Sequence, residues 1–334
     1  MMKTLVRFAG FLMLLALCAA RAEAIDILPF QSQNQSPLIA VYGLPALGSA
    51  KVVPGSTGTL RLTLDQANNY INEINAAESL VLDGESTRLS FSGRYGIGRS
   101  LELGITIPFV VAGGGFLDNF IETYHATFGF PNGGRELAPR NRLLYRYQKN
   151  GVTLFNMESS GQGPGDVSVN AGWQIYQSAA SGRNLTLRAS LKLPTGDAGS
   201  LRGSGSTDLA AWMIGDWGRR FSLGQVTLFG AAGGMGMTKG RVLADQQRPL
   251  VGFGMLGFGF APADWIYLKV QTNAHTAFYS DSDLKQINAA SVQLTMGGAL
   301  YFTPRTSLDI GVTEDLLVGT SPDVVFHFSM AHTF

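Results

Sequence analysis

Between Gly163 and Trp217 the chain alternates apolar and polar residues in three runs of about ten positions each. In 184–193, apolar residues occupy the odd positions, while Thr186, Arg188, Ser190 and Lys192 occupy even ones. A period of two is typical of a β-strand with one apolar face and one polar face. A soluble sandwich would bury the apolar face, whereas a membrane barrel would turn it to lipid and the charged face to its lumen.

The same alternation recurs from Gly58 to the end of the chain. The predicted strands are 58–66, 78–96, 99–111, 165–177, 184–194, 207–217, 223–236, 249–261, 264–277, 288–302, 305–317 and 323–334. Short connections lie near 97–99, 178–183, 218–222, 262–263 and 303–304, and the connections near 67–77, 112–164, 195–206, 237–248, 278–287 and 318–322 include the long ones. Short turns at one end, longer loops at the other and an even strand number are typical of outer-membrane proteins. We therefore predict an all-β fold, a transmembrane antiparallel β-barrel of about 12 strands.

The strand number depends on two short segments. Asp83-Gly84 is either a kink inside a long strand or a hairpin turn. The segments 142–148 and 152–157, joined by Lys149-Asn150-Gly151, are either a hairpin inside the outer loop 112–164 or two more wall strands. The first interpretation, which we prefer, gives twelve strands, and the alternative gives fourteen.

The charged residues of the predicted strands fall on one face. With the apolar residues outside, the lumen-lining residues are Arg61, Arg88, Arg94, Glu102, Asp166, Arg188, Lys192, Asp208, Asp216, Lys269, His275, Asp309 and His327. A basic side chain on the lipid face at the bilayer midplane costs about 2–4 kcal/mol, so a dozen there would exceed the stability of an ordinary domain. Opposite charges on adjacent strands indicate a cross-braced lining, which favours a narrow or plugged barrel over a wide porin.

The N-terminus has the pattern of a signal peptide, residues 1–24. Lys3 and Arg7 precede an apolar run, Phe8–Ala20, and Ala22-Glu23-Ala24 fits a cleavage site. The run is shorter than the roughly 20 residues that a spanning helix needs. Cys18 is the only cysteine, so the mature chain is expected to have no disulfide, no thiol catalysis and no cysteine metal site.

The segment 25–57 contains four prolines and scattered glycines, which argue against regular structure. It could be a disordered leader or a plug folded into the barrel. Its apolar residues, among them Leu38, Ile39, Val41 and Tyr42, make simple disorder less favourable. The barrel itself is predicted to span 58–334.

Composition and aromatic positions indicate the bacterial outer membrane. Charged residues make up 15% of the chain, against about 25% in ordinary domains, and the net charge of +1 gives no reason to expect nucleic acid as a partner. Tyr95, Trp217 and Phe302 lie outward beside short turns, where an aromatic girdle belongs. The last strand ends on Phe334 and resembles the C-terminal signal of outer-membrane proteins, although His332 departs from it. The expected partners are outer-membrane lipids, lipopolysaccharide and the barrel-assembly machinery; no cofactor or metal is expected.

The outer loop 112–164 contains a predicted short amphipathic helix. After Gly113-Gly114-Gly115, apolar residues recur at helical spacing, opposite Asp118, Asn119, Glu122 and Thr123. The helix would be a lid that gates or binds a ligand, or a cap that seals the lumen. The lid residues are Phe116, Phe120, Ile121, Tyr124 and His125.

Two histidines raise the alternative of a lipid- or lipopolysaccharide-modifying enzyme. His125 has acidic neighbours in the predicted helix, and His275 precedes Ser280, Asp281 and Asp283 at the predicted outer rim. A helix histidine satisfied by a carboxylate explains His125 as well, and the chain has no Gly-x-Ser-x-Gly motif. We therefore expect no enzymatic activity.

Two family resemblances agree with this fold. GPGD at 163–166, KLPTGD at 192–197 and GSGSTD at 203–208 resemble the barrel family associated with the phenol-degradation meta-pathway, which is grouped with transporters of hydrophobic compounds. A closer resemblance, over about residues 34–217, is to an uncharacterised Gram-negative outer-membrane family known as a domain of unknown function. It rests on NQSPL at 34–38, YGLP at 42–45, DGE at 83–85, GGFLD at 114–118 with Ile121-Glu122 and His125, GGR at 133–135 and KLPTG at 192–196.

The resemblances support the fold but bring no settled activity. The expected function is that of a channel or transport protein for small hydrophobic or amphiphilic compounds. The alternatives are a lipid-modifying enzyme and a structural or surface-binding barrel.

Overall fold

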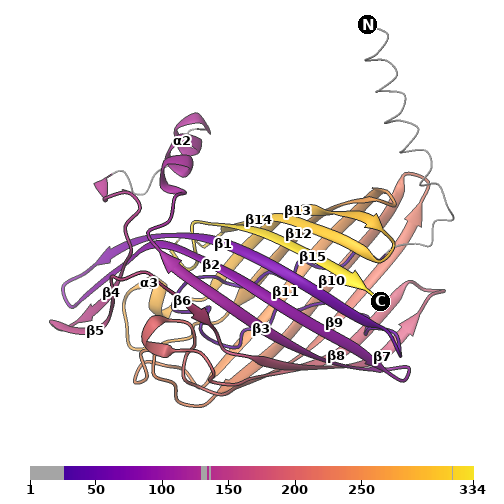
Figure 1. The fold of residues 1–334 in the computed structure, drawn as a ribbon, viewed down its shortest axis with the longest axis horizontal. Helices are drawn as coiled ribbons and strands as arrows, with labels where there is room; N and C mark the ends of the chain where they lie inside the picture. Colours follow the sequence, from indigo (N-terminus) through magenta and orange to yellow (C-terminus); the bar gives the residue numbers. More distant parts are fainter. Residues whose placement is uncertain (1–25, 129–133, 135–136, 318) are drawn as a thin grey trace, which may run out of the picture.

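Twelve antiparallel strands close into a barrel in the computed structural model, because β1 pairs with both β2 and β15 (Figure 1). The structure describes residues 26–128, 134, 137–317 and 319–334, without the side chains of Tyr124, His125 and Phe128. The predicted signal peptide lies outside this range. The wall strands are β1 (Gly58–Ile74), β2 (Glu78–Ile97), β3 (Leu101–Gly113), β7 (Ser168–Ser178), β8 (Arg183–Lys192), β9 (Asp208–Phe221), β10 (Gly224–Met237), β11 (Leu250–Ala263), β12 (Ile266–His275), β13 (Ser291–Thr303), β14 (Thr306–Asp315) and β15 (Val324–Thr333).

The prediction of twelve strands is confirmed, and the fourteen-strand alternative is wrong. β2 remains extended through Asp83-Gly84. Its residues 85–97 pair with β3, and its residues 78–83, at the outer end, pair with β4 (Leu144–Lys149). β4 and β5 (Val152–Met157) form a hairpin on this outer part of β2 and are not part of the closed wall. A further short strand, β6 (Gly161–Pro164), pairs with the outer end of β3 and was not predicted.

The predicted loop 67–77 is wrong in extent, because β1 continues to Ile74 and pairs with β2 up to Ser79. Asn68 and Asn69, at the start of this stretch, are buried instead of facing solvent, whereas Asn72 and Asn75 are exposed. Gln66 Nε2 donates to Glu85 at 2.8 Å, and Asn68 Nδ2 donates to Asp118 at 3.2 Å. Amides that are satisfied inside a barrel have the same sequence signature as amides in a turn, which explains the error.

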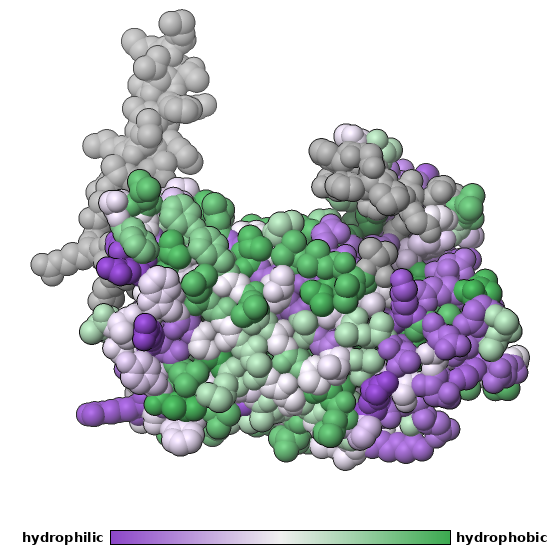
Figure 2. Space-filling model, turned by 180° about the vertical axis from the view of Figure 1, so that it is seen from behind, coloured by the Kyte–Doolittle hydropathy of each residue, from purple (hydrophilic) through white to green (hydrophobic). Residues whose placement is uncertain are grey.

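The outward face of the wall is apolar. Leu60, Leu62, Leu103 and Ile105 are exposed, and the face seen in Figure 2 is largely apolar across the barrel wall, with hydrophilic residues gathered at the outer-loop end. Tyr95 and Phe302 are exposed near the short-turn end. This is the surface that the hydrocarbon layer of a membrane requires.

The helices of the described residues lie in the outer loops. They are α2 (Asp118–Phe128), the 3₁₀ turn η2 (Ala198–Ser200) and α3 (Lys285–Asn288). Among the described residues, no helix has the length and apolar character that crossing a membrane would require.

The N-terminal segment, residues 26–57, runs through the interior of the barrel, with Asp26 and residues 54–56 exposed at its two ends (Figure 1). One arm runs outward along β12, where the Phe30 amide donates to Gln271 Oε1 at 2.8 Å. The segment turns near the outer end, where the Tyr279 hydroxyl donates to the Leu38 carbonyl at 2.8 Å. The second arm returns along the opposite wall, where the Val53 amide donates to Glu102 at 2.7 Å. The interior of the barrel is therefore largely filled by its own chain.

Candidate functional site

Lys192, at the outer end of β8, is the centre of a buried polar cluster. Its Nζ lies 2.5 Å from Asp166 Oδ2 and 3.2 Å from Asp208 Oδ2, and it donates to Ser204 Oγ at 2.7 Å. All four residues are less than 5% exposed. The three motifs GPGD, KLPTGD and GSGSTD thus converge on one ammonium group, although they are separated in sequence.

The loop before β9 folds around Asp166. The carboxylate accepts hydrogen bonds from the Gly196 amide at 2.7 Å and the Ser204 amide at 3.2 Å. A side chain at Gly203 would overlap the same carboxylate, which explains the glycine there. A hydrogen bond from the Ser200 hydroxyl and one from the Gly199 amide lower the pKa of Asp197, so this cap of η2 remains ionised.

The Lys192 cluster also holds the N-terminal segment. Asp208 Oδ2 accepts a hydrogen bond from the Gly43 amide at 2.7 Å. A Cβ at position 43 would lie 3.0 Å from Lys192 Cβ and 3.1 Å from Asp208 Cβ. Wall, outer loop and N-terminal segment are therefore coupled at this point.

A second ion pair, Arg188–Glu102, connects β8 to β3 and binds the returning arm. Arg188 Nε donates to the Ser49 carbonyl at 2.8 Å, and Arg188 Nη2 donates to the Lys51 carbonyl at 3.0 Å. Arg94 lies 3.8 Å from the same Glu102 carboxylate. Two arginines therefore share one carboxylate.

A third network lies on the opposite wall. Asp309 pairs with Lys269 and, at 3.2 Å, with Arg61. Lys269 donates to the Leu28 carbonyl at 3.1 Å and lies 4.0 Å from the centre of the Phe30 ring, a cation–π contact. His327 Nδ1 lies 2.6 Å from Asp65 Oδ1. The N-terminal segment is thus held by charged groups on both sides of the lumen.

The other predicted lumen residues also lie on the inner face. Asp216 accepts a hydrogen bond from Asn184 Nδ2 at 2.6 Å. His275 Nε2 lies 2.9 Å from Asn34 Nδ2, and His275 Nδ1 lies 2.9 Å from the Thr276 carbonyl. Within the described residues, His275 has no hydrogen bond to Ser280, Asp281 or Asp283, so its ring positions the N-terminal segment instead of forming a serine–histidine–acid chain. No described group of three or more His, Cys, Asp or Glu residues could hold a metal ion.

The predicted lid residues lie at the outer rim. Phe116 and Phe120 are exposed, whereas Ile121 is buried. The Phe120 ring lies 6.1 Å from the ring of Phe326, and Figure 1 shows α2 projecting beside the barrel instead of crossing its opening. The side chains of Tyr124 and His125 lie outside the described part of the chain.

Sequence reasoning did not identify an apolar sector of the inner wall, on β9–β11. Its inward side chains are Trp212, Ile214, Phe229, Met235, Val251, Phe253 and Met255, which belong to one cluster with Leu38, Tyr42, Leu243, Tyr279 and Ile287. Trp212 Nε1 donates to the Leu47 carbonyl at 3.0 Å. The available signal was that these strands are apolar on both faces, as in the consecutive residues Trp212 and Met213.

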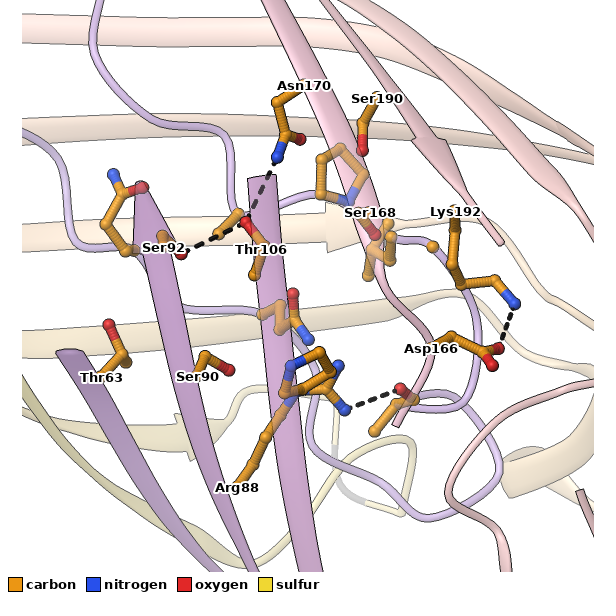
Figure 3. Close-up of a pocket in the computed structure, with 18 of the residues that line it drawn as sticks. Thr63, Arg88, Ser90, Ser92, Thr106, Asp166, Ser168, Asn170, Ser190 and Lys192 are labelled. Carbon is orange, nitrogen blue, oxygen red and sulfur yellow. Dashed lines mark hydrogen bonds and ion pairs between the residues drawn. The ribbon is translucent and has the colours of Figure 1, made fainter. Parts of the chain in front are cut away.

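A polar cavity of about 100 Å³ remains between the N-terminal segment and the wall formed by β1–β3, β7 and β8 (Figure 3). Arg88, Ser90, Ser168 and Ser190 are among its lining residues. A larger space of about 440 Å³ lies at the short-turn end, and both spaces are lined by Arg61, Ser92 and Arg94. The filled lumen therefore still contains adjoining polar spaces.

Comparisons with known proteins agree with this architecture. The model of the family described as protein of unknown function (DUF3187) matches residues 8–334. None of the curated proteins matches the chain. The COG4313 outer membrane channel from Pseudomonas putida F1 is 12% identical, with 85% of this chain and 97% of that chain covered and a TM-score of 0.52. The NanC porin is 8% identical (82% and 98% covered, TM-score 0.43), and the translocator domain of the autotransporter NalP from Neisseria meningitidis is 9% identical (83% and 88% covered, TM-score 0.41). The fold is that of a bacterial outer-membrane barrel.

Proposed function

The chain belongs to the DUF3187 family, and from that premise we propose that this outer-membrane barrel is a channel for small hydrophobic or amphiphilic compounds, plugged by its N-terminal segment. The observation that carries the proposal is the arrangement of that segment. It is held by hydrogen bonds to the wall, while polar spaces remain beside it. A permanently sealed barrel has no need of such spaces.

The two chemistries of the inner wall support an amphiphilic solute. β9–β11 present Trp212, Phe229 and Phe253 to the lumen, whereas β1 and β2 present Arg61, Arg88 and Arg94. A compound with an apolar body and a polar group could contact both sectors once the N-terminal segment moves.

The proposal is tested by reconstituting two proteins, the full chain and a variant that lacks residues 26–54. We expect small, intermittent conductance from the full chain and a steady conductance several times larger from the variant. Heat-modifiable migration on gels checks that the variant is a folded barrel. Uptake of a small aromatic solute into liposomes should follow the same order. A folded variant that neither conducts nor admits solute contradicts the channel.

That contradicting result would support the second candidate, a structural or surface-binding barrel. The cross-bracing of the lumen by the Lys192, Arg188 and Lys269 networks is the observation that favours it. The lipid-modifying enzyme has less support, because the hydrogen bonds of His275 are made to Asn34 and to a backbone carbonyl.

We also propose that the C-terminal strand is the part recognised by the barrel-assembly machinery. Phe334 exchanges two backbone hydrogen bonds with Gly58, at 2.9 and 3.0 Å, and so completes closure of the barrel. Phe334→Ala should reduce the amount of folded barrel in the outer-membrane fraction, while Leu223→Ala, in an exposed short turn, should not. Equal amounts of the two variants would contradict this role.

A further inference from the structure

Arg88 differs from the other cations that line the polar cavity because its guanidinium has few partners. Its Nη1 donates to the Ala40 carbonyl at 3.1 Å, and Figure 3 shows the guanidinium in the middle of the lining residues. A guanidinium has five N–H donors, so most of its capacity is unused by this bond. Within the described residues, Arg88 forms no ion pair with a carboxylate. Asp65 and Asp166 line the same cavity and favour this charge through space, but neither forms an ion pair with Arg88. Holding a cation inside a protein is costly, and an anion bound directly to the guanidinium would offset that cost.

The neighbouring cations have carboxylate partners, some of which are shared. Arg61 shares Asp309 with Lys269, Arg94 shares Glu102 with Arg188, and Lys192 has both Asp166 and Asp208. Of the three arginines Arg61, Arg88 and Arg94, Arg88 is the one that forms no ion pair with a described carboxylate, so a negatively charged ligand would complement it.

Hydroxyl groups beside Arg88 provide further donors. Ser90 lies on the same strand two residues away, and Ser168 and Ser190 line the cavity from β7 and β8 (Figure 3). None of these three hydroxyls forms a hydrogen bond with another described residue. Because the three side chains are small, they also leave the cavity open. About 10–15 Å³ of such space holds one water molecule, so a cavity of about 100 Å³ has room for a carboxylate group and part of its carbon skeleton.

We propose that Arg88, with Ser90, Ser168 and Ser190, binds the carboxylate of a small organic acid. The planar fork of a guanidinium matches the two oxygens of a carboxylate, which accept two parallel hydrogen bonds. Arg61 and Arg94 line both this cavity and the larger space at the short-turn end. The inference rests on the proposed channel function and specifies its solutes as amphiphilic carboxylates.

Calorimetric titration of the purified full chain with benzoate tests the site. Benzyl alcohol is the neutral probe and inorganic phosphate the inorganic anion. We expect saturable binding of benzoate, no binding of benzyl alcohol and weaker binding of phosphate. Arg88→Gln should weaken benzoate binding about tenfold or more, because a charge-assisted, two-fold hydrogen bond is lost. Arg99→Gln, in the exposed turn between β2 and β3, is the matched control and should bind as the parent does.

Arg88→Lys separates binding from folding. It retains the charge without the planar fork and should bind benzoate with intermediate affinity, while heat-modifiable migration confirms the barrel. Absence of benzoate binding, equal binding by Arg88→Gln or binding of phosphate as tight as that of benzoate would each overturn the carboxylate site. Because binding is measured without transport, a protein that conducts but does not bind benzoate refutes the site alone. A protein that binds but does not conduct refutes the channel alone.

Discussion

At the residue scale, Lys192 decides how the outer half of the barrel is assembled. Its ammonium group forms ion pairs with two carboxylates that belong to different motifs, and one of these carboxylates also accepts a hydrogen bond from the Gly43 amide. A buried charge cluster does not by itself add stability, but removing one member leaves the others uncompensated.

Lys192→Met should therefore destabilise the barrel strongly. Asp166 and Asp208 would remain buried without a counter-charge, and losing one partner of a buried pair costs about 3–5 kcal/mol. The measurement is thermal unfolding in detergent, with Lys239→Met, in an exposed pair with Asp245, as the matched control. The triple variant Lys192→Met with Asp166→Asn and Asp208→Asn should recover part of the loss. A single variant as stable as the control would show that the cluster is not needed.

The sequence predicts which face of the wall these side chains occupy, but it does not predict which groups they contact. A period of two places Arg188, Lys192 and Asp208 on the inner face because side-chain direction in a strand is a local property. It does not reveal that Arg188 binds the carbonyls of Ser49 and Lys51, since that contact depends on a segment with no periodicity.

At the element scale, the N-terminal segment is the part of the molecule most suited to move. Its own backbone has no strand pairing apart from an isolated bridge between Gly55 and Gly96, and its contacts are individual hydrogen bonds and the packing of apolar side chains such as Leu38 and Tyr42. The apolar pattern of 38–42 could predict that the segment is ordered, but not which wall residues it meets. Local periodicity likewise does not show that 161–164 pairs with β3 or that β1 continues to Ile74, because both depend on pairing with distant strands.

Gly43→Val should loosen the N-terminal segment without opening the wall. The new Cβ would lie about 3 Å from Lys192 Cβ and Asp208 Cβ, closer than ordinary contact, so residues around 43 must shift away from Asp208. We expect faster amide hydrogen exchange in 38–47 and unchanged exchange in the wall strands. Gly161→Val is the control, since nothing lies within 4 Å of a Cβ there. Unchanged exchange in 38–47 would mean that the segment is not anchored at Gly43.

At the scale of the whole molecule, the interior is divided into a charged sector and an apolar sector around one internal segment. The barrel and its strand number could be predicted because every strand repeats the same signal and the membrane penalises charge on the outer face. The filling of the lumen could not be predicted, because a barrel of about twelve strands is intermediate in width between barrels filled by their side chains and barrels with an open channel.

The most direct test of the account is the conductance of a barrel with its N-terminal segment fixed. Ser32 Oγ and Thr295 Oγ1 lie 3.3 Å apart, so the double variant Ser32→Cys, Thr295→Cys places two sulfurs close enough to join. Both ends of residues 33–57 are then attached to the wall. We predict that the oxidised barrel does not open in planar bilayers and that reduction of the disulfide restores the conductance of the parent protein. Equal conductance before and after reduction would contradict a channel plugged by its N-terminal segment.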